Sequence, residues 1–235
     1  GDPELVTLRA QRILQEADVV LVPSTEASAG GMGRAEEIIR AACPHMTGRV
    51  QPVPFSMAQR RGLGTKRIES WRASADFAVD AFNDGAHSVA LATVGDPAVY
   101  STFTYLRANV EERLPDVVIA LVPGITAMQA IAAAAGTPLV EGREILALVP
   151  ATVGSEKLGE VLDVVDSVTV YKGGRKMPEV LEQIRERGRD AIIGTDVSLP
   201  TQHLLGLAQV EADESAPYFS TVLSVPERPV TGGKL

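Results

Sequence analysis

One stretch constrains the fold of this 235-residue chain more than any other: an apolar run, a sharp break and a helical pattern. Residues 89–93 predict a short buried strand, Val94-Gly95-Asp96-Pro97 breaks it, and residues 99–114 predict a helix that ends before Pro115. A strand, a glycine turn and a helix make a loop type that binds ligands at the carboxyl end of a parallel sheet. Glycine permits close backbone approach to a ligand, and proline fits the first turn of a helix.

The carboxylate of Asp96 has two interpretations. It either faces a ligand bound at this loop, or caps a helix in a purely structural turn. The sequence leaves both open.

Apolar runs and helical patterns alternate over the first half of the chain, which predicts a parallel sheet covered by helices. The second half differs in pattern, and the fold class expected for the whole chain is α/β. Residues 204–210 and 218–225 predict an antiparallel pair at a sheet edge. We expect an N-terminal domain over 1–141, a C-terminal domain over 142–226 and a tail over 227–235. The other predicted strands are 19–22, 49–55, 117–122, 145–149, 167–171 and 190–194, and the other predicted helices are 5–17, 34–42, 68–83, 128–135, 158–165 and 177–186.

Composition excludes several classes of protein. The formal net charge of −8 argues against broad nucleic-acid binding. A single cysteine, Cys43, rules out an internal disulfide, and three widely spaced histidines give no metal-ligand pattern. No apolar run of about 20 residues predicts a transmembrane helix, and no signal peptide is visible. We therefore expect a soluble protein of a reducing cytoplasm, with no metal.

Positive charge is concentrated in one segment of this acidic chain. Residues 44–75 hold six basic side chains against one acidic side chain, Glu69. Arg60, Arg61, Lys66 and Arg67 flank glycines, which predicts a loop that leads into a helix. Arginine pairs with carboxylates in a bidentate fork, so the segment suits a small polyanionic ligand. An ordinary solvated surface is the alternative.

The glycine and proline loops that follow the predicted strands are not phosphate-binding motifs. No Walker motif is present, and no GxGxxG follows the first predicted strand. A Gly-Asp-Pro turn instead offers a carboxylate and carbonyl oxygens. These groups suit a cationic or amine-bearing cofactor better than a phosphate.

Four motifs resemble those of the tetrapyrrole methylases, a family of S-adenosylmethionine-dependent enzymes of the cobalamin and sirohaem pathways. The resemblance covers nearly the whole chain. Residues 95–103, 139–142 and 216–223 are most similar to the branch of the family that methylates C20 of precorrin-2, or of its cobalt form, cobalt-factor II, to give precorrin-3A. The four motifs are Gly1-Asp2-Pro3-Glu4-Leu5-Val6-Thr7-Leu8, residues 94–100, Val122-Pro123-Gly124-Ile125-Thr126-Ala127 and Val170-Tyr171-Lys172-Gly173-Gly174-Arg175.

The resemblance implies two α/β domains with S-adenosylmethionine folded in the cleft between them, S-adenosylhomocysteine as a product, and a homodimer. It also implies which positions bind the cofactor. These are Val94, Gly95, Asp96, Val99, Thr126, Ala127, Tyr171, Lys172 and, more loosely, Val197. For the tetrapyrrole substrate, which carries eight carboxylates in the family, we expect contacts from Arg60, Arg61, Lys66, Arg67 and Tyr100.

Two departures from the family pattern stand out. Members begin with a strand and a Gly-Pro-Gly loop ahead of the position of Gly1, and that strand is absent from these 235 residues. We expect its absence to expose neighbouring strand edges. In addition, residues 193–198 are less hydrophobic than the equivalent family segment.

The implied reaction requires little acid–base catalysis from the protein. A sulfonium methyl is already electrophilic, so the enzyme mainly aligns it with the meso carbon of the tetrapyrrole and excludes water. A proton must later leave that carbon. Near the motif the polar candidates are Tyr100, Tyr105 and His87, and none is assigned as the base; His87 is expected on a surface turn.

Two alternatives remain open. The chain could be a family relative that methylates another corrin position, RNA or a modified histidine. It could also be a non-catalytic scaffold that binds S-adenosylmethionine.

Overall fold

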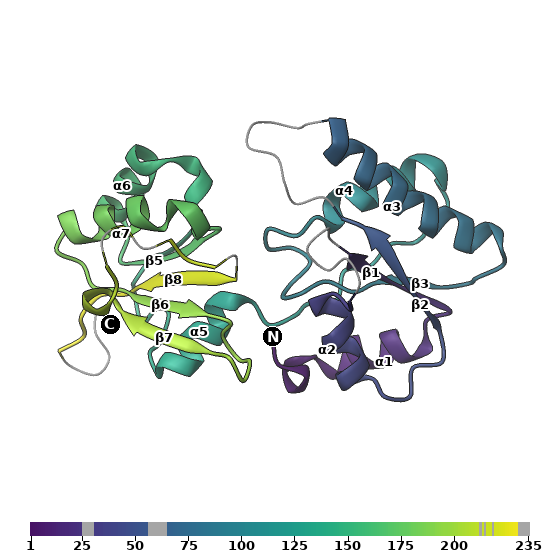
Figure 1. The fold of residues 1–235 in the computed structure, drawn as a ribbon, viewed down its shortest axis with the longest axis horizontal. Helices are drawn as coiled ribbons and strands as arrows, with labels where there is room; N and C mark the ends of the chain where they lie inside the picture. The colour runs from purple at the N-terminus through teal and green to yellow at the C-terminus, as the bar shows by residue number, and fades with distance from the viewer. Residues whose placement is uncertain (25–30, 56–64, 212, 214, 218, 230–235) are drawn as a thin grey trace. The chain divides into compact units, whose positions relative to one another are not determined.

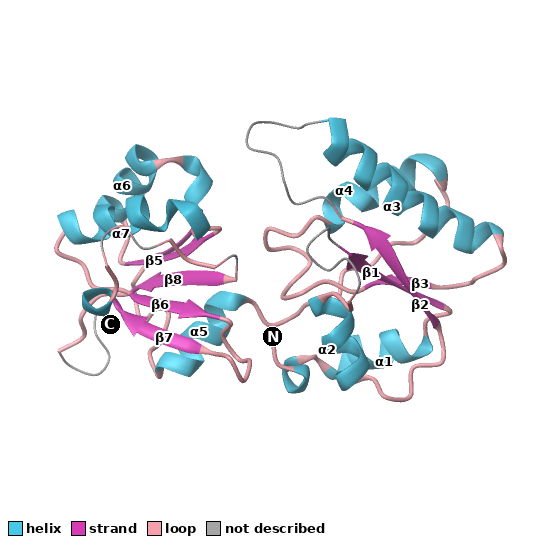
Figure 2. Cartoon of the chain, viewed as in Figure 1, coloured by secondary structure: helices cyan, strands magenta, loops and turns pink. Residues whose placement is uncertain are grey.

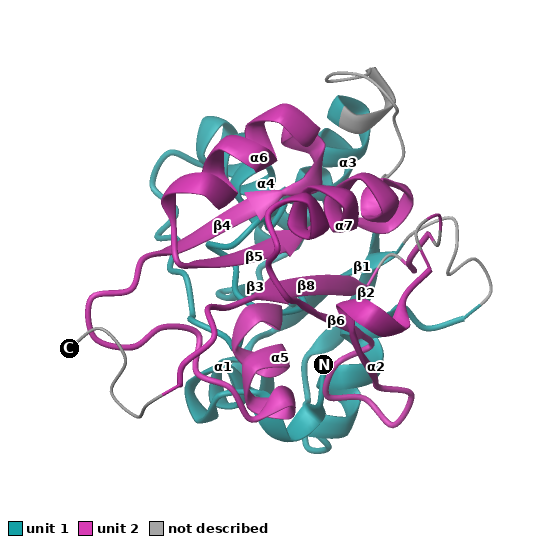
Figure 3. Ribbon diagram, turned by 90° about the vertical axis from the view of Figure 1, so that its left-hand side faces the viewer, with its two compact units in different colours: residues 1–125 teal, residues 126–235 magenta. Residues whose placement is uncertain are grey.

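The computed structural model describes residues 1–24, 31–55, 65–211, 213, 215–217 and 219–229. The chain divides into two compact units, Gly1–Ile125 and Thr126–Leu235 (Figure 3). Each unit is an α/β structure with its own sheet and its own helices (Figure 2). The predicted fold class is therefore confirmed.

Unit 1 is built on a three-stranded parallel sheet in the order β2-β1-β3. The central strand β1 pairs with β2 over its whole length and with β3 through residues 19–21. The elements of unit 1 are α1 (Leu8–Glu16), β1 (Val19–Ser24), α2 (Arg34–Ala42), β2 (Arg49–Pro54), α3 (Thr65–Asn83), β3 (Val89–Leu91) and α4 (Phe103–Arg113), preceded by a short 3-10 turn over Pro3–Leu5.

The side chains of β1 alternate between two apolar layers. Val20 and Val22 pack with residues of α1 and α2, whereas Val19 and Leu21 pack with residues of α3 and α4. Both faces of the sheet are covered (Figure 1), which explains why residues 19–22 are a continuous apolar run rather than an alternating one.

Unit 2 is built on a five-stranded mixed sheet in the order β4-β5-β8-β6-β7. Strand β4 is parallel to β5, and β8 is antiparallel to both of its neighbours, β5 and β6. The elements of unit 2 are α5 (Ala127–Ala135), β4 (Leu146–Pro150), α6 (Ser155–Val164), β5 (Ser167–Tyr171), α7 (Met177–Glu186), β6 (Ile192–Thr195), β7 (His203–Gly206) and β8 (Ser220–Ser224).

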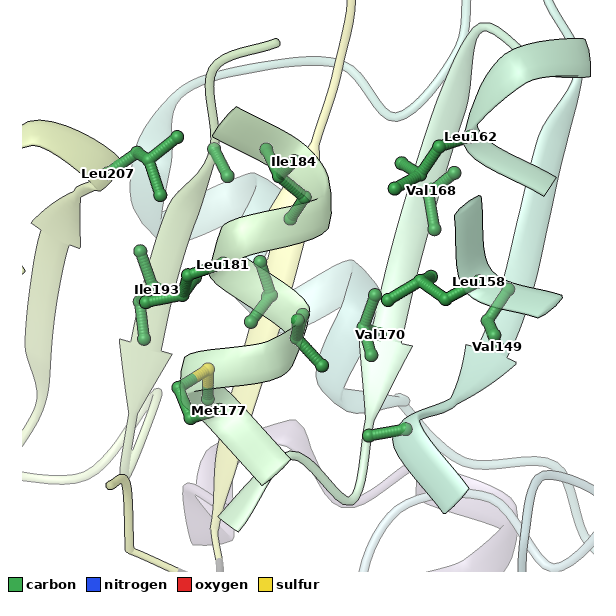
Figure 4. Close-up of a cluster of buried hydrophobic side chains, with 14 of the residues drawn as sticks. Val149, Leu158, Leu162, Val168, Val170, Met177, Leu181, Ile184, Ile193 and Leu207 are labelled. Atoms are coloured by element: carbon green, nitrogen blue, oxygen red, sulfur yellow. The ribbon is translucent and has the colours of Figure 1, made fainter. Parts of the chain in front are cut away.

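The main core of unit 2 lies between its sheet and helices α6 and α7 (Figure 4). Leu158 of α6 and Leu181 of α7 are buried against strand residues that include Val168 and Val170. The opposite face of the sheet packs on α5, where Ile131 contacts a cluster that includes Leu223. Because α5 belongs to this core, the chain divides before Thr126, and the domain boundary that we predicted at 141/142 lies inside unit 2.

One predicted strand is wrong. Residues 117–122 have no regular secondary structure, although their apolar run predicts a buried strand. Val117 and Ile119 pack against the core of unit 1, whereas Val118 is 93% exposed. An apolar run marks burial, but a strand also needs a hydrogen-bonded partner, and the structure gives this segment none in a ladder.

The predicted antiparallel pairing of residues 204–210 with residues 218–225 at a sheet edge is also wrong. Strand β7 does lie at the edge, but it pairs with β6, and β8 lies in the middle of the sheet. The five buried positions of β8 explain this placement, since an edge strand of this sheet would expose some of them.

The helix predicted from residue 99 begins later, at Phe103. The intervening residues form turns: the N–H of Val99 donates to the carbonyl of Asp96, and Tyr100 has a left-handed backbone with a φ of 50°. Pro97 is consequently not in the first turn of α4, and Asp96 does not cap that helix, because the N-cap is Thr102.

Part of the predicted tail is fixed to unit 2. The Arg228 guanidinium donates to both carboxylate oxygens of Glu144, at 3.0 and 2.7 Å. The two side chains are 11% and 2% exposed. Among the helices of the described residues, none has the length and apolar character to cross a membrane.

Candidate functional site

In unit 1, the Asp96 carboxylate connects two of the motifs. Its Oδ1 accepts a hydrogen bond from the N–H of Ala98 at 2.7 Å, and its Oδ2 accepts one from the N–H of Gly124 at 2.9 Å. The first bond closes the turn after β3, and the second ties that turn to the Pro-Gly loop 28 residues later. Asp96 therefore caps no helix, and its carboxylate accepts two backbone N–H groups. Contact between this loop and a ligand stays a prediction.

The same two loops touch through their glycines. A side chain at Gly124 would overlap the carbonyl oxygen of Gly95, so the loops approach as closely as they do only because residue 124 has no Cβ. Gly95 has a φ of +80°, and a Cβ built there would have its nearest atom 3.8 Å away, at the Ile125 carbonyl oxygen. A Cβ at Gly95 would therefore meet that oxygen in ordinary van der Waals contact, without the overlap found at Gly124.

A third motif contacts the same Pro-Gly loop. The Thr7 hydroxyl, whose oxygen caps α1 by accepting the N–H of Ala10, lies 3.4 Å from the carbonyl oxygen of Pro123. Three segments that are far apart in the sequence thus meet in unit 1, around residues 123 and 124.

In unit 2, the fourth motif supports the start of α5. The Tyr171 hydroxyl, at the end of β5, accepts a hydrogen bond from the N–H of Met128 at 3.0 Å. Thr126 and Gln129 form a capping box at the same helix terminus. Burial raises the pKa of Tyr171, and hydrogen bonds with Met128 and Thr126 oppose that rise. The phenol is therefore neutral at physiological pH and acts here as a hydrogen-bonding group.

Strained residues gather at one edge of the sheet of unit 2. Strands β5 and β6 run in the same direction, because both are antiparallel to β8. Their carboxyl ends consequently share an edge, where Lys172, Asp196 and Ser198 all have positive φ angles of 50–68°. Such backbone strain in residues other than glycine is typical of functional sites. Val197 lies between two of these residues and packs on the cluster of Ile131.

The predicted site residues lie on several different elements of the two units. In unit 1, Val94 and Tyr100 are each 39% exposed on the motif loop. In unit 2, Thr126 is buried, and Ala127 begins α5. Lys66 and Arg67 belong to the first turn of α3, and Arg60 and Arg61 lie outside the described residues.

Two of the candidate bases, Tyr105 and His87, contact other residues of unit 1. The Tyr105 ring stacks on Trp71 at a centroid distance of 3.9 Å, which fixes α4 to α3. His87 is exposed on the turn before β3, as expected, and its backbone N–H donates to Asp18. In the described part of the chain, no three His, Cys, Asp or Glu side chains come together as metal ligands would.

Several residues of the site escaped the sequence-based prediction. Thr7 and Gly124 lie inside quoted motifs, and a Thr before a helix or a glycine after a proline could have indicated them. Asp196 and Ser198 carry no such signal, because nothing in their residue types requires a positive φ.

Comparison with known proteins decides the family. Residues 1–210 match the family model described as "Tetrapyrrole (Corrin/Porphyrin) Methylases". The chain belongs to the tetrapyrrole methylase family. The resemblance stated from the four motifs is thereby confirmed.

Relatives within the tetrapyrrole methylases cover almost the entire chain. A precorrin-2 C(20)-methyltransferase of Sinorhizobium sp is 31% identical over 227 residues, which are 95% of this chain and 90% of that protein. A cobalt-precorrin-2 C(20)-methyltransferase of Salmonella typhimurium is 29% identical over 95% of this chain and 91% of its own length.

A solved structure agrees with the tetrapyrrole methylase fold. A uroporphyrin-III C-methyltransferase from Thermus thermophilus, complexed with S-adenosylhomocysteine, superposes with a TM-score of 0.67 at 21% identity, covering 96% of this chain and 93% of that one. At this identity the likeness concerns the fold.

Proposed function

We propose that this tetrapyrrole methylase transfers a methyl group from S-adenosylmethionine to C20 of precorrin-2, or of its cobalt form, in cobalamin biosynthesis. The observation that carries the proposal is the meeting of three family motifs at residues 123 and 124, held by Asp96 and Thr7. The names of the two relatives described above support the position of methylation on the ring.

The residues present fit the cofactor. A Cβ at Gly95 would have one backbone oxygen within 4 Å, and the missing side chain lets a ligand approach the backbone of the loop closely. We propose that the cofactor-binding positions are the nine expected from the resemblance, and that the Gly-Asp-Pro loop, Asp96 included, contacts the cofactor through its backbone. The nine positions are Val94, Gly95, Asp96, Val99, Thr126, Ala127, Tyr171, Lys172 and Val197.

When bound, S-adenosylmethionine supplies a methyl group on a positively charged sulfur, which a carbon nucleophile attacks directly. The protein's task is therefore to orient and to exclude water, and ideal alignment of two reactants lowers a barrier by about 7–11 kcal/mol. Hydrogen bonds from Ala98 and Gly124 to Asp96 fix one loop, and the bond of Met128 to Tyr171 fixes the start of α5. No general base is assigned.

For the substrate, we propose that Arg60, Arg61, Lys66 and Arg67 pair with its carboxylates and that Tyr100 contributes a partly exposed ring. The same resemblance supports a homodimer, which light scattering on the purified protein tests. A monomer at micromolar concentration would contradict the proposed homodimer and would leave the proposed reaction unaffected.

The decisive experiment incubates the purified protein with precorrin-2 and S-adenosylmethionine that carries a carbon-13 methyl group. We expect one labelled methyl per macrocycle, placed at C20 by NMR. Label at another ring position would assign a different reaction of the family. Binding of S-adenosylmethionine without any transfer, to either the metal-free or the cobalt form, would instead support the non-catalytic scaffold.

A further inference from the structure

Asp96 connects the Gly-Asp-Pro loop with the Pro-Gly loop through both of its carboxylate oxygens. Oδ1 receives the N–H of Ala98, two residues later, and Oδ2 receives the N–H of Gly124, from a distant part of the chain. A carboxylate that accepts backbone N–H groups makes charge-assisted hydrogen bonds, which are stronger than neutral ones. Each oxygen of this side chain is thus hydrogen-bonded to a backbone N–H group.

The bond to Gly124 lies beside a second constraint. The two glycines are so close that a Cβ on Gly124 would overlap the Gly95 carbonyl oxygen. The backbone of Gly95, which has a φ of +80°, is therefore packed directly against Gly124. Asp96 and Gly124 together hold that backbone in place.

We propose that Asp96 is a positioning residue, whose carboxylate ties the Pro-Gly loop to the Gly-Asp-Pro loop and so shapes the backbone that receives the cofactor. It acts through Gly124 and makes no direct electrostatic contact with the sulfonium. This inference rests on the proposed function, because it concerns the same cofactor.

Loss of the carboxylate should weaken ligand binding, because the two loops would then be less ordered before the ligand binds. Without the carboxylate, the N–H of Gly124 loses its partner and the two loops lose their connection. A ligand that binds there would have to order the loops itself and would lose affinity accordingly. This cost is the same for any ligand that occupies the loop, whatever the charge on its sulfur.

Calorimetric titration with two ligands separates positioning from direct attraction. S-Adenosylmethionine has a positive sulfur and S-adenosylhomocysteine a neutral one. We expect Asp96→Asn to weaken both ligands by the same factor, about tenfold or more. Direct attraction between the carboxylate and the sulfonium would weaken S-adenosylmethionine selectively, and that result would overturn the inference.

A double-mutant cycle tests whether Asp96 acts through Gly124. Gly124→Ala breaks the contact between the loops while the carboxylate remains. If Asp96 acts through Gly124, the two substitutions are not additive. The double variant should then bind S-adenosylhomocysteine no more weakly than whichever single variant has the lower affinity. Additive losses would mean that Asp96 contacts the ligand independently, which contradicts the proposal.

Asp116→Asn is the matched control, since it removes one negative charge from an exposed turn of the same unit. It should leave both dissociation constants unchanged. If Asp96→Asn does not fold, as judged by circular dichroism, Asp96→Ser replaces it, because a hydroxyl still reaches the N–H of residue 98 but not that of Gly124.

The remaining outcomes separate the two proposals. Asp96 variants that bind both ligands as tightly as the wild type would overturn the inference and leave the proposed function standing. A wild-type protein that binds neither ligand at millimolar concentration would contradict the proposed function, and this inference with it.

Discussion

Tyr171, the last residue of β5, accepts through its hydroxyl the backbone N–H of Met128 in the first turn of α5. The two residues are 43 positions apart in the sequence. A helix leaves its first N–H groups without partners inside the helix, and here a side chain from the neighbouring sheet satisfies one of them. The Tyr-Lys-Gly-Gly motif therefore has a structural task besides any contact with a ligand.

Replacing Tyr171 by phenylalanine should remove the hydrogen bonds of its hydroxyl with Met128 and Thr126 and keep the ring. We expect Tyr171→Phe to lower the free energy of unfolding by about 1 kcal/mol, measured by urea denaturation. It should also weaken the binding of S-adenosylhomocysteine, because the start of α5 loses its support. Tyr105→Phe is the matched control, since that ring is 42% exposed and would keep its stacking on Trp71. Equal effects of the two substitutions would contradict this role of the Tyr171 hydroxyl.

Gly95 offers a second test. Gly95→Ala should cost about 1–2 kcal/mol of stability, because an L-residue at positive φ is strained. It should also place a methyl group on the loop that we propose binds the cofactor. We expect a loss of S-adenosylhomocysteine affinity of at least about tenfold by calorimetry. Gly85→Ala is the control: it too has a positive φ, and a Cβ there meets nothing within 4 Å. If Gly85→Ala weakens the ligand as much, the effect at Gly95 reflects strain rather than contact.

The pairing of Arg228 with Glu144 predicts a pH dependence. The Arg228 guanidinium holds the pKa of Glu144 below its usual value near 4.5. A carboxyl whose pKa is lower in the folded state stabilises the fold above its unfolded pKa, and that contribution is lost as pH falls through the folded value. Arg228→Met should therefore destabilise the protein by about 1–3 kcal/mol at pH 7 and by less below pH 4. Chemical denaturation at both pH values measures the difference, and an equal effect at the two would contradict the assignment.

The basic segment predicts a dependence on salt. The double substitution Arg60→Ala with Arg61→Ala should raise KM for the tetrapyrrole several-fold and leave the affinity for the cofactor unchanged, because several weak contacts with one polyanion act together. KM of the wild type should rise with ionic strength, since exposed charges are screened over about 8–10 Å. Arg9→Ala with Arg12→Ala removes the same charge from exposed positions of α1 and should change neither constant. Kinetics unaffected by salt and by the first pair would leave this segment as ordinary surface.

Local patterns predicted most of the elements, since α2, β5 and α7 have the bounds that their residues indicate. These elements have clear apolar periodicity and clear ends. The errors concern which segments pair with one another in the sheets. Residues 117–122 resemble a strand in composition but lack a ladder, and β8 has the composition of any buried strand, so its neighbours could not be read from its own residues.

For the candidate site, the motifs predicted which loops matter but not how they are held. The bond from Gly124 to Asp96 joins residues 28 positions apart, and a sequence pattern does not encode such a pairing. The helix expected from residue 99 fails for the same reason, because Asp96 draws the following N–H groups into a turn that competes with the helix.

The central place of β8 has a consequence for biosynthesis. Strands β5 and β6 are joined only by β8, which is the last strand of the described chain. While the polypeptide is still being made, the ribosome therefore releases two half-sheets whose facing edges have no partner until residues 220–224 emerge. Because exposed strand edges of this kind pair readily with other chains, we expect the nascent unit 2 to be prone to aggregation until β8 fills the gap between β5 and β6.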